Sequence, residues 1–188
     1  MAISPKFYQR FPVVIESLTN VENLNFVLKS AIRKEGDAFD GSRNSSAKCL
    51  MTRWDMHKEY ESFAMIGDAA IRLAKLVPMA ERTKMDGTPY PVELEIDESW
   101  GLIYRKGQRT SKHMHWPSLW SYTYCVSGCS NCSPFTFMGV NVFDKFIKPK
   151  AGQMILFPAW IMHKVPKHKC EHERIMIAGN LKEKYKNA

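Results

Sequence analysis

The sequence lacks a long apolar segment, since no hydrophobic run reaches the ~20 residues that a membrane-spanning helix needs. It also lacks a charged leader followed by an apolar stretch at its start, MAISPKFYQRFPVV, which is the pattern of a secretory signal. We therefore expect a cytoplasmic protein with no membrane association. Hydrophobic residues make up 45% and charged residues 24%, so the composition excludes a disordered chain. A length of 188 residues suits one domain with its own hydrophobic core.

The sequence has few cysteines, and their number, five, is odd. An odd count argues against a disulfide framework in a chain without a secretory signal. Clusters of basic residues are also few, although the formal net charge is +8. The lysines and arginines are scattered apart from KFIKPK, KVPKHK and the tail KEKYKN, which favours a solvated basic surface over a nucleic-acid site. We expect no nucleic-acid partner.

The first 90 residues have helical patterns. A helix is predicted over 20–36, with Asn20 as its cap, a shared apolar face and Gly36 at its end. A second is predicted over 57–77, closed by Pro78. The intervening segment 37–49 is rich in turn residues and predicts a connection.

Residues 91–188 change to short strands separated by glycine and proline. Strands are predicted over 92–96, 99–105, 119–126, 134–138, 153–157, 160–165 and 173–181. Many short strands at this spacing indicate a β-sandwich or barrel. The predicted architecture is mainly β, with the N-terminal helices packed as a layer on the β core of one structural domain.

A His-x-His pair is the most informative motif. Side chains at positions i and i+2 of a strand point to the same face, so His113 and His115 can reach one metal ion. His163 follows an apolar strand and a proline turn, and it can supply a third ligand. Histidines with open coordination positions suit a redox iron centre. A histidine pair alone is nevertheless weak evidence, because ordinary surface or core histidines are common.

Arg174 strengthens the metal hypothesis. It opens a strand on which Arg174, Met176, Ala178 and Asn180 share one face. An arginine that points into an apolar barrel needs an anion, because an unpaired buried charge is very costly. Its planar guanidinium matches a carboxylate in two places. The alternative is a surface arginine paired with Glu171 or Glu173.

From Trp100 to Leu181 the sequence resembles the 2-oxoglutarate/iron(II) oxygenases, particularly a prolyl-hydroxylase-like group common in marine bacteria and their phages. Five sequence features carry the resemblance: a Trp strand with a later Gly, an HxH motif, an S-x-x-Y strand, a G-x-x-x-L-F-P turn, and a distal His-x-Val-Pro with Glu-Arg before a strand ending in Asn. Here they are Trp100, Gly107, His113-Met-His115, Ser121-Tyr-Thr-Tyr124, Gly152 to Pro158, His163 to Pro166, and Glu173-Arg174 through Asn180.

The resemblance implies a double-stranded β-helix, or jelly roll, that binds Fe(II), 2-oxoglutarate and O2. It places His113 and His163 as the two iron-binding histidines, Arg174 at the distal carboxylate of 2-oxoglutarate, and Tyr124 at that same carboxylate. His115 stands where most of the superfamily has Asp or Glu, although histidine is frequent there in the prolyl-hydroxylase-like group. A phage protein of this kind would act in the host cytoplasm.

The implied activity is hydroxylation of an unactivated C–H bond, with a prolyl or peptide substrate as the first hypothesis. Trp116, Trp120 and Trp160 lie near the ligands in sequence and are candidates for the substrate mouth, or else ordinary aromatic core. Two alternatives stay open: a non-catalytic metal-binding jelly-roll protein, and a three-histidine dioxygenase in which Arg174 grips a small thiol substrate's carboxylate. A nucleic-acid demethylase has only the basic charge in its favour. The sequence does not predict an oligomeric state.

The remaining cysteines suggest a second metal. Short ligand pairs in separate loops are the usual layout of a structural zinc site. The predicted ligands are Cys129, Cys132, Cys170 and His172, with Cys125 or His168 as substitutes. If the chain folds as a jelly roll, the loop with Cys129 and Cys132 and the loop with Cys170 and His172 both lie at the closed end of the barrel, away from the iron. The alternatives are reduced thiols in a packed loop and a redox pair, which no thioredoxin-like pattern supports.

Overall fold

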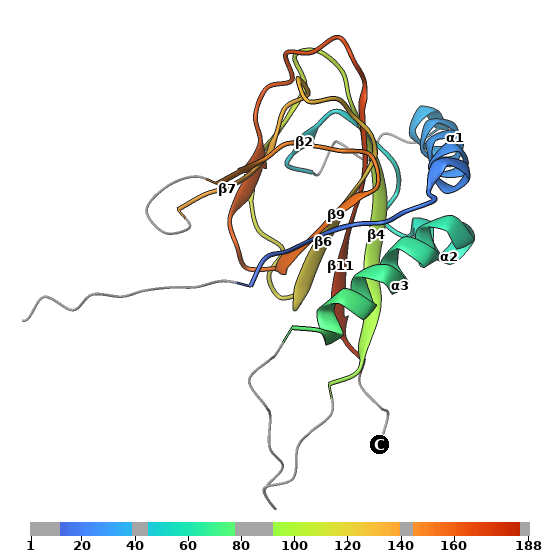
Figure 1. The fold of residues 1–188 in the computed structure, drawn as a ribbon, viewed down its shortest axis with the longest axis vertical. Helices are drawn as coiled ribbons and strands as arrows, with labels where there is room; N and C mark the ends of the chain where they lie inside the picture. The colour runs from blue at the N-terminus through green and yellow to red at the C-terminus, as the bar shows by residue number, and fades with distance from the viewer. Residues whose placement is uncertain (1–11, 39–44, 78–91, 140–144, 185–188) are drawn as a thin grey trace, which may run out of the picture.

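The computed structural model describes residues 12–38, 45–77, 92–139 and 145–184. Within them, two antiparallel sheets face each other and helices cover the outer side of one sheet (Figure 1). The larger sheet has six strands in the order β1-β9-β6-β11-β4-β3. The smaller has five, in the order β2-β5-β10-β7-β8. The prediction of a double-stranded β-helix with N-terminal helices is confirmed.

Each of the seven predicted strands overlaps an observed strand. The large-sheet strands are β1 (Val14–Ser17), β3 (Leu50–Met51), β4 (Leu94–Tyr104), β6 (Trp120–Ser127), β9 (Gln153–Pro158) and β11 (Arg174–Glu183). Those of the small sheet are β2 (Ala47–Lys48), β5 (Arg109–His113), β7 (Phe135–Phe137), β8 (Lys145–Ile147) and β10 (His163–Val165). The predicted strands 92–96 and 99–105 are one continuous strand, because β4 pairs along its length with β11.

The first 90 residues contribute strands as well as helices. Strands β1 and β3 form the two edges of the large sheet, and β2 is an edge of the small one. These short strands have no clear alternation of their own, and they form because an open edge of the core offers backbone partners. The segment 37–49, predicted as a connection, thus includes β2, while residues 39–44 lie outside the described residues.

Both predicted helices form with different ends. Helix α1 (Glu22–Ala38) begins after Asn20, which has a φ of 56° and does not cap it, and it continues through Gly36. A Cβ at Gly36 would lie 2.0 Å from Leu50, so this glycine allows a close approach to β3. The second helix is divided into α2 (Met56–Glu59) and α3 (Glu61–Lys75) by the extended Tyr60. The predicted end at Pro78 lies outside the described residues.

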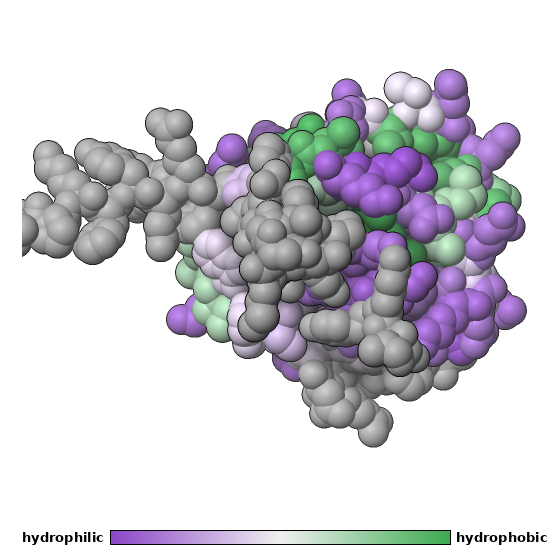
Figure 2. Space-filling model, turned by 90° about the horizontal axis from the view of Figure 1, so that it is seen from below, coloured by the Kyte–Doolittle hydropathy of each residue, from purple (hydrophilic) through white to green (hydrophobic). Residues whose placement is uncertain are grey.

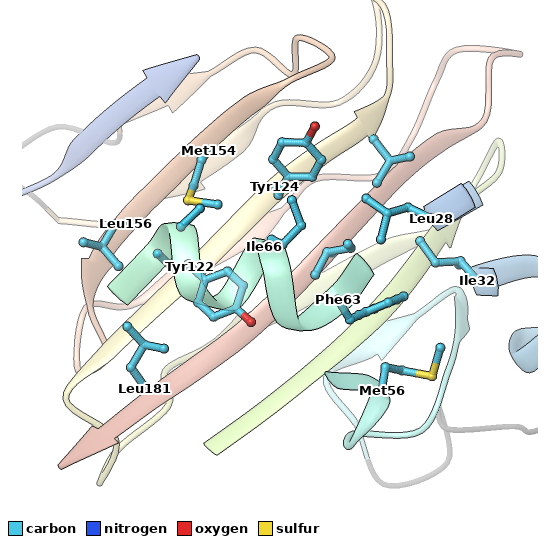
Figure 3. Packing of buried hydrophobic residues seen from close by; sticks show 14 of the residues in the cluster. Leu28, Ile32, Met56, Phe63, Ile66, Tyr122, Tyr124, Met154, Leu156 and Leu181 are labelled. Carbon is cyan, nitrogen blue, oxygen red and sulfur yellow. The ribbon is translucent and has the colours of Figure 1, made fainter. Parts of the chain in front are cut away.

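The helices pack on the outer face of the large sheet. Apolar residues of α1 and α3, including Leu28, Ile32, Phe63 and Ile66, meet the outward side chains of β6, β9 and β11 (Figure 3). A second apolar cluster fills the space between the two sheets. The large sheet therefore has buried side chains on both faces.

No helix among the described residues is both long and apolar enough to cross a membrane. Seen from below, the surface carries hydrophilic residues around smaller hydrophobic groups (Figure 2).

Candidate metal centre and adjoining pocket

Three histidines converge at one end of the barrel. His113 ends β5 and lies directly across from His163, the first residue of β10. His115 lies two residues beyond the end of β5, where its backbone N–H donates to the carbonyl of Ala159 at 2.7 Å. One ring nitrogen from each histidine lies within 4.8 Å of the others. The structure thus brings together the three predicted iron ligands in a group that can hold one ion.

Two of these histidines are oriented for a metal by backbone carbonyls. The Nδ1 atom of His113 lies 2.8 Å from the carbonyl of Ser111, and that of His163 lies 2.9 Å from the carbonyl of Ile161. A carbonyl only accepts, so each Nδ1 carries the ring proton and each Nε2 keeps its lone pair for a metal.

His115 has a different neighbour. Its Nδ1 lies 3.4 Å from the side-chain nitrogen of Asn180, which also donates to Glu98 at 3.0 Å. An amide nitrogen only donates, so this contact places the ring proton of His115 on Nε2. His115 must therefore change its tautomer, or bind through Nδ1, to become a ligand. Sequence reasoning missed Glu98, which has no motif of its own and reaches the site only through Asn180.

Burial keeps the three imidazoles neutral. Removal from water lowers the pKa of all three, and the neighbouring histidines lower it further for His115, to about 3, and for His163. Neutral imidazole is the form that binds a metal. At neutral pH no proton has to be displaced by the metal from His113 or His163.

A cavity of about 280 Å³ extends from the histidines into the barrel, and its lining includes Arg174. This is close to the lower end of the ~300–1,000 Å³ of drug-sized pockets, so a small acid fits it. Polar side chains also line the cavity, among them Thr110, Ser121 and Thr123. The cavity can therefore hold a ligand that meets the histidines at one end and Arg174 at the other.

Arg174 is buried without an anion. Its side chain is 1% exposed, its Nε has no hydrogen-bond partner, and no carboxylate of the described residues forms an ion pair with it. The guanidinium lies 4.9 Å from the ring centre of Tyr104. The nearby thiols are neutral, because burial raises the pKa of Cys49 to about 12 and that of Cys125 to about 11. Arg174 thus faces the cavity as an uncompensated cation, and the alternative of a surface arginine is wrong.

Tyr124 does not reach this cavity. Its side chain lies on the helix-facing side of β6, where its hydroxyl donates to Asn25 of α1 at 2.8 Å (Figure 3). The prediction that it contacts a ligand beside Arg174 is wrong for this structure. Tyr104 lies beside Arg174 instead, on strand β4 next to β11, with its hydroxyl 2.6 Å from that of Thr110. Tyr104 of β4 lies directly opposite Arg174 of β11, and this pairing depends on the register of the two strands, which the sequence does not provide.

The three tryptophans predicted at the substrate mouth differ in exposure. Trp120 is 4% exposed and belongs to the helix-facing cluster, so its assignment to the mouth is wrong. Trp116 and Trp160 are 72% and 44% exposed and follow or precede the histidines closely in sequence. The tryptophans that line the cavity are Trp54 and Trp100, whose rings lie 4.6 Å apart. Trp54 comes from a segment in which no ligand-binding motif was visible.

The predicted zinc ligands come together only in part. The sulfurs of Cys129, Cys132 and Cys170 form a second group within 4.8 Å of one another, while the ring of His172 is outside it. Cys125 is buried in the cluster between the sheets. His168 is unavailable, because its Nε2 contacts the carbonyl of His172 at 2.7 Å and its Nδ1 contacts the N–H of Ser133 at 3.3 Å.

Comparison with known proteins agrees with this geometry. Residues 140–180, which include His163, Arg174 and Asn180, match the model of a family described as "Putative 2OG-Fe(II) oxygenase". The likeness to the 2-oxoglutarate/iron(II) oxygenases is confirmed. No curated protein matches the chain significantly in sequence.

Solved structures of this class share the fold. A collagen prolyl hydroxylase of Paramecium Bursaria Chlorella virus-1, in complex with 2-oxoglutarate, is 16% identical with a TM-score of 0.66, covering 90% of this chain and 94% of that one. A Pseudomonas putida prolyl-4-hydroxylase is 12% identical with a TM-score of 0.68, covering 92% and 93%. HygX of Streptomyces hygroscopicus, with nickel and 2-oxoglutarate, is 11% identical with a TM-score of 0.66, covering 92% and 83%. Two of these three neighbours, the viral enzyme and HygX, are thus in complex with 2-oxoglutarate.

Proposed function

We propose that the protein is an Fe(II)- and 2-oxoglutarate-dependent dioxygenase that hydroxylates an unactivated C–H bond. The observation that carries this proposal is the buried Arg174, which has no anionic partner among the described residues and lines the same cavity as three converging histidines. An α-keto dicarboxylate has a chelating end for the metal and a distal carboxylate for the guanidinium. The donor set of neutral imidazoles and one arginine fits both groups.

His113 and His163 would hold the iron through Nε2, and His115 would complete the site as the weakest of the three ligands. When bound, iron and 2-oxoglutarate supply the oxidising power, with O2 as oxidant and succinate and CO2 as products. The chain's own contribution is orientation. Backbone carbonyls orient two imidazoles, Arg174 and Tyr104 would hold the distal carboxylate, and apolar lining residues such as Phe157 and Met176 would limit the water beside it.

A peptide or protein is the substrate class that we favour, with prolyl residues first. Four large apolar side chains within three residues of the three histidines in sequence are exposed, namely Met114, Trp116, Trp160 and Met162. Exposed apolar side chains so close to the histidines in sequence suit a polypeptide substrate better than a small polar molecule. One fold neighbour, a prolyl hydroxylase of Trichoplax adhaerens, is in complex with a hypoxia inducible factor peptide fragment.

We place the activity in the cytoplasm, where the five free cysteines would stay reduced.

The test is an anaerobic titration of the apoprotein with Fe(II) and 2-oxoglutarate, monitored by the visible metal-to-ligand charge-transfer band. We expect a band in the natural protein, none in His163→Ala or His113→Ala, and a band at higher iron concentration in His115→Ala. Equal loss in all three variants would show that His115 ligates as firmly as the others. Iron binding without any band would favour the non-catalytic protein or the three-histidine dioxygenase. Succinate release with prolyl peptides then tests the substrate class.

A further inference from the structure

The second group of candidate ligands lies at the opposite end of the barrel from the histidines. Cys129 and Cys132 are in the loop that follows β6, and Cys170 is in the loop between β10 and β11. Strand β6 begins beside the histidine end, where Trp120 pairs with Pro158, and runs away from it. Strand β11 runs back from Arg174 to Leu181, which also pairs with Trp120. The three thiols thus lie beyond Arg174, outside the proposed iron centre.

The sulfur positions match a metal better than a disulfide. The Sγ of Cys129 lies 3.6 Å from that of Cys132 and 3.5 Å from that of Cys170. A disulfide would need a separation of ~2.05 Å. Four ligands at a zinc–sulfur distance of ~2.3 Å in a tetrahedron are separated by about 3.8 Å, close to both values.

Backbone groups around the cluster support thiolate ligands. The N–H of Cys129 donates to the Sγ of Cys132, and the N–H of His172 donates to the Sγ of Cys170, each at 3.4 Å. Donors of this kind around metal-bound sulfur are the expected surroundings of a zinc site.

The two loops are also joined independently of the cysteines. His168 bridges them through its contacts with the carbonyl of His172 and the N–H of Ser133. The hydroxyl of Ser133 donates to the carbonyl of Lys167 at 3.1 Å. These hydrogen bonds join the two loops and so keep the three sulfurs near one another.

We propose that Cys129, Cys132 and Cys170 bind a structural zinc ion, with His172 as the fourth ligand. The backbone of His172 already contacts the cluster, and its exposed ring can turn toward it without unfolding the loop. Binding replaces the three thiol protons by Zn²⁺, with no change in oxidation state. The ion would close the loop that leads into Arg174, four residues after Cys170, and so would fix the position of the buried guanidinium.

Zinc content is the direct test. The protein is purified under reducing conditions without chelators, and metals are measured by mass spectrometry. We expect about one zinc per chain in His113→Ala protein, in which the histidine centre no longer competes for the metal. Cys129→Ser and Cys170→Ser should lose it, whereas the matched control Cys49→Ser, which removes a buried thiol elsewhere, should retain it. His172→Ala should weaken zinc binding roughly 10-fold or more.

A second measurement uses the natural protein, so it does not depend on whether the cysteine variants fold. Cobalt(II) added to the natural apoprotein should give the sulfur-to-metal charge-transfer bands of a thiolate site. Absence of zinc and of these bands in folded protein, or a Cys129–Cys132 disulfide under the same conditions, would overturn the proposal. Zinc binding is read out without iron or 2-oxoglutarate, so a failure of the proposed oxygenase activity would leave this result unaffected.

Discussion

The two faces of the large sheet use the same strands for different purposes. On the outer face, Tyr122, Tyr124 and Ile177 pack against the helices and make the hydrophobic core. On the inner face, alternate residues of the same strands, such as Thr123 and Arg174, line the cavity. Both faces are buried, and the inner one carries the polar side chains that line the cavity. The difference shows that burial in this protein has two roles, stability on one face and ligand binding on the other.

The largest effect is expected on the outer face. Phe63 of α3 is 0% exposed within the helix-facing cluster. Phe63→Ala should lower the free energy of unfolding by about 3–5 kcal/mol, because it leaves a cavity in the core. Urea unfolding followed by circular dichroism measures the loss, and Phe63→Leu is the milder control. The folded fraction should bind 2-oxoglutarate as the natural protein does. A weaker intrinsic affinity would show that the two faces are coupled.

An inner-face substitution should reverse this pattern. Arg174→Ala removes a pair of charge-assisted hydrogen bonds worth about 3 kcal/mol in total, so 2-oxoglutarate should bind ~100-fold more weakly. The apoprotein should not lose comparable stability, because the guanidinium has no anionic partner among the described residues. Anaerobic calorimetry measures the affinity. Arg105→Ala, which removes an exposed arginine paired with Glu173, is the matched control and should bind normally.

A pair of tyrosines gives the finest comparison. Tyr124→Phe loses a hydrogen bond to Asn25 and should cost about 1 kcal/mol of stability without changing 2-oxoglutarate affinity. Tyr104→Phe loses a hydroxyl inside the cavity beside Arg174 and should weaken that affinity ~3–10-fold. Titrating both variants by the charge-transfer band, with urea unfolding in parallel, separates the two effects. If Tyr124→Phe alone weakened cosubstrate binding, the assignment of the faces would be refuted.

The sequence by itself indicated the fold class, the three histidines as one group, and the shared face of Arg174 with Met176, Ala178 and Asn180, while it left a surface position for Arg174 open. These followed from local periodicity and from residue types with few alternatives, because β11 alternates visibly and a buried guanidinium requires an anion. The two helices predicted in the first 90 residues also form, except that the second is divided at Tyr60.

The tertiary structure alone decided which face of β6 meets the cavity. Seven of the eight residues of β6 are buried. The alternation along the strand therefore places Tyr124 and Thr123 on opposite faces, but it does not indicate which face lines the inside of the barrel. The placing of Tyr104 beside Arg174 required the β4–β11 register, and the placing of Trp54 required long-range packing. The proton on His115 Nε2 depends on Asn180, which is distant in sequence. Such features arise from contacts between separate strands, and a local pattern does not encode them.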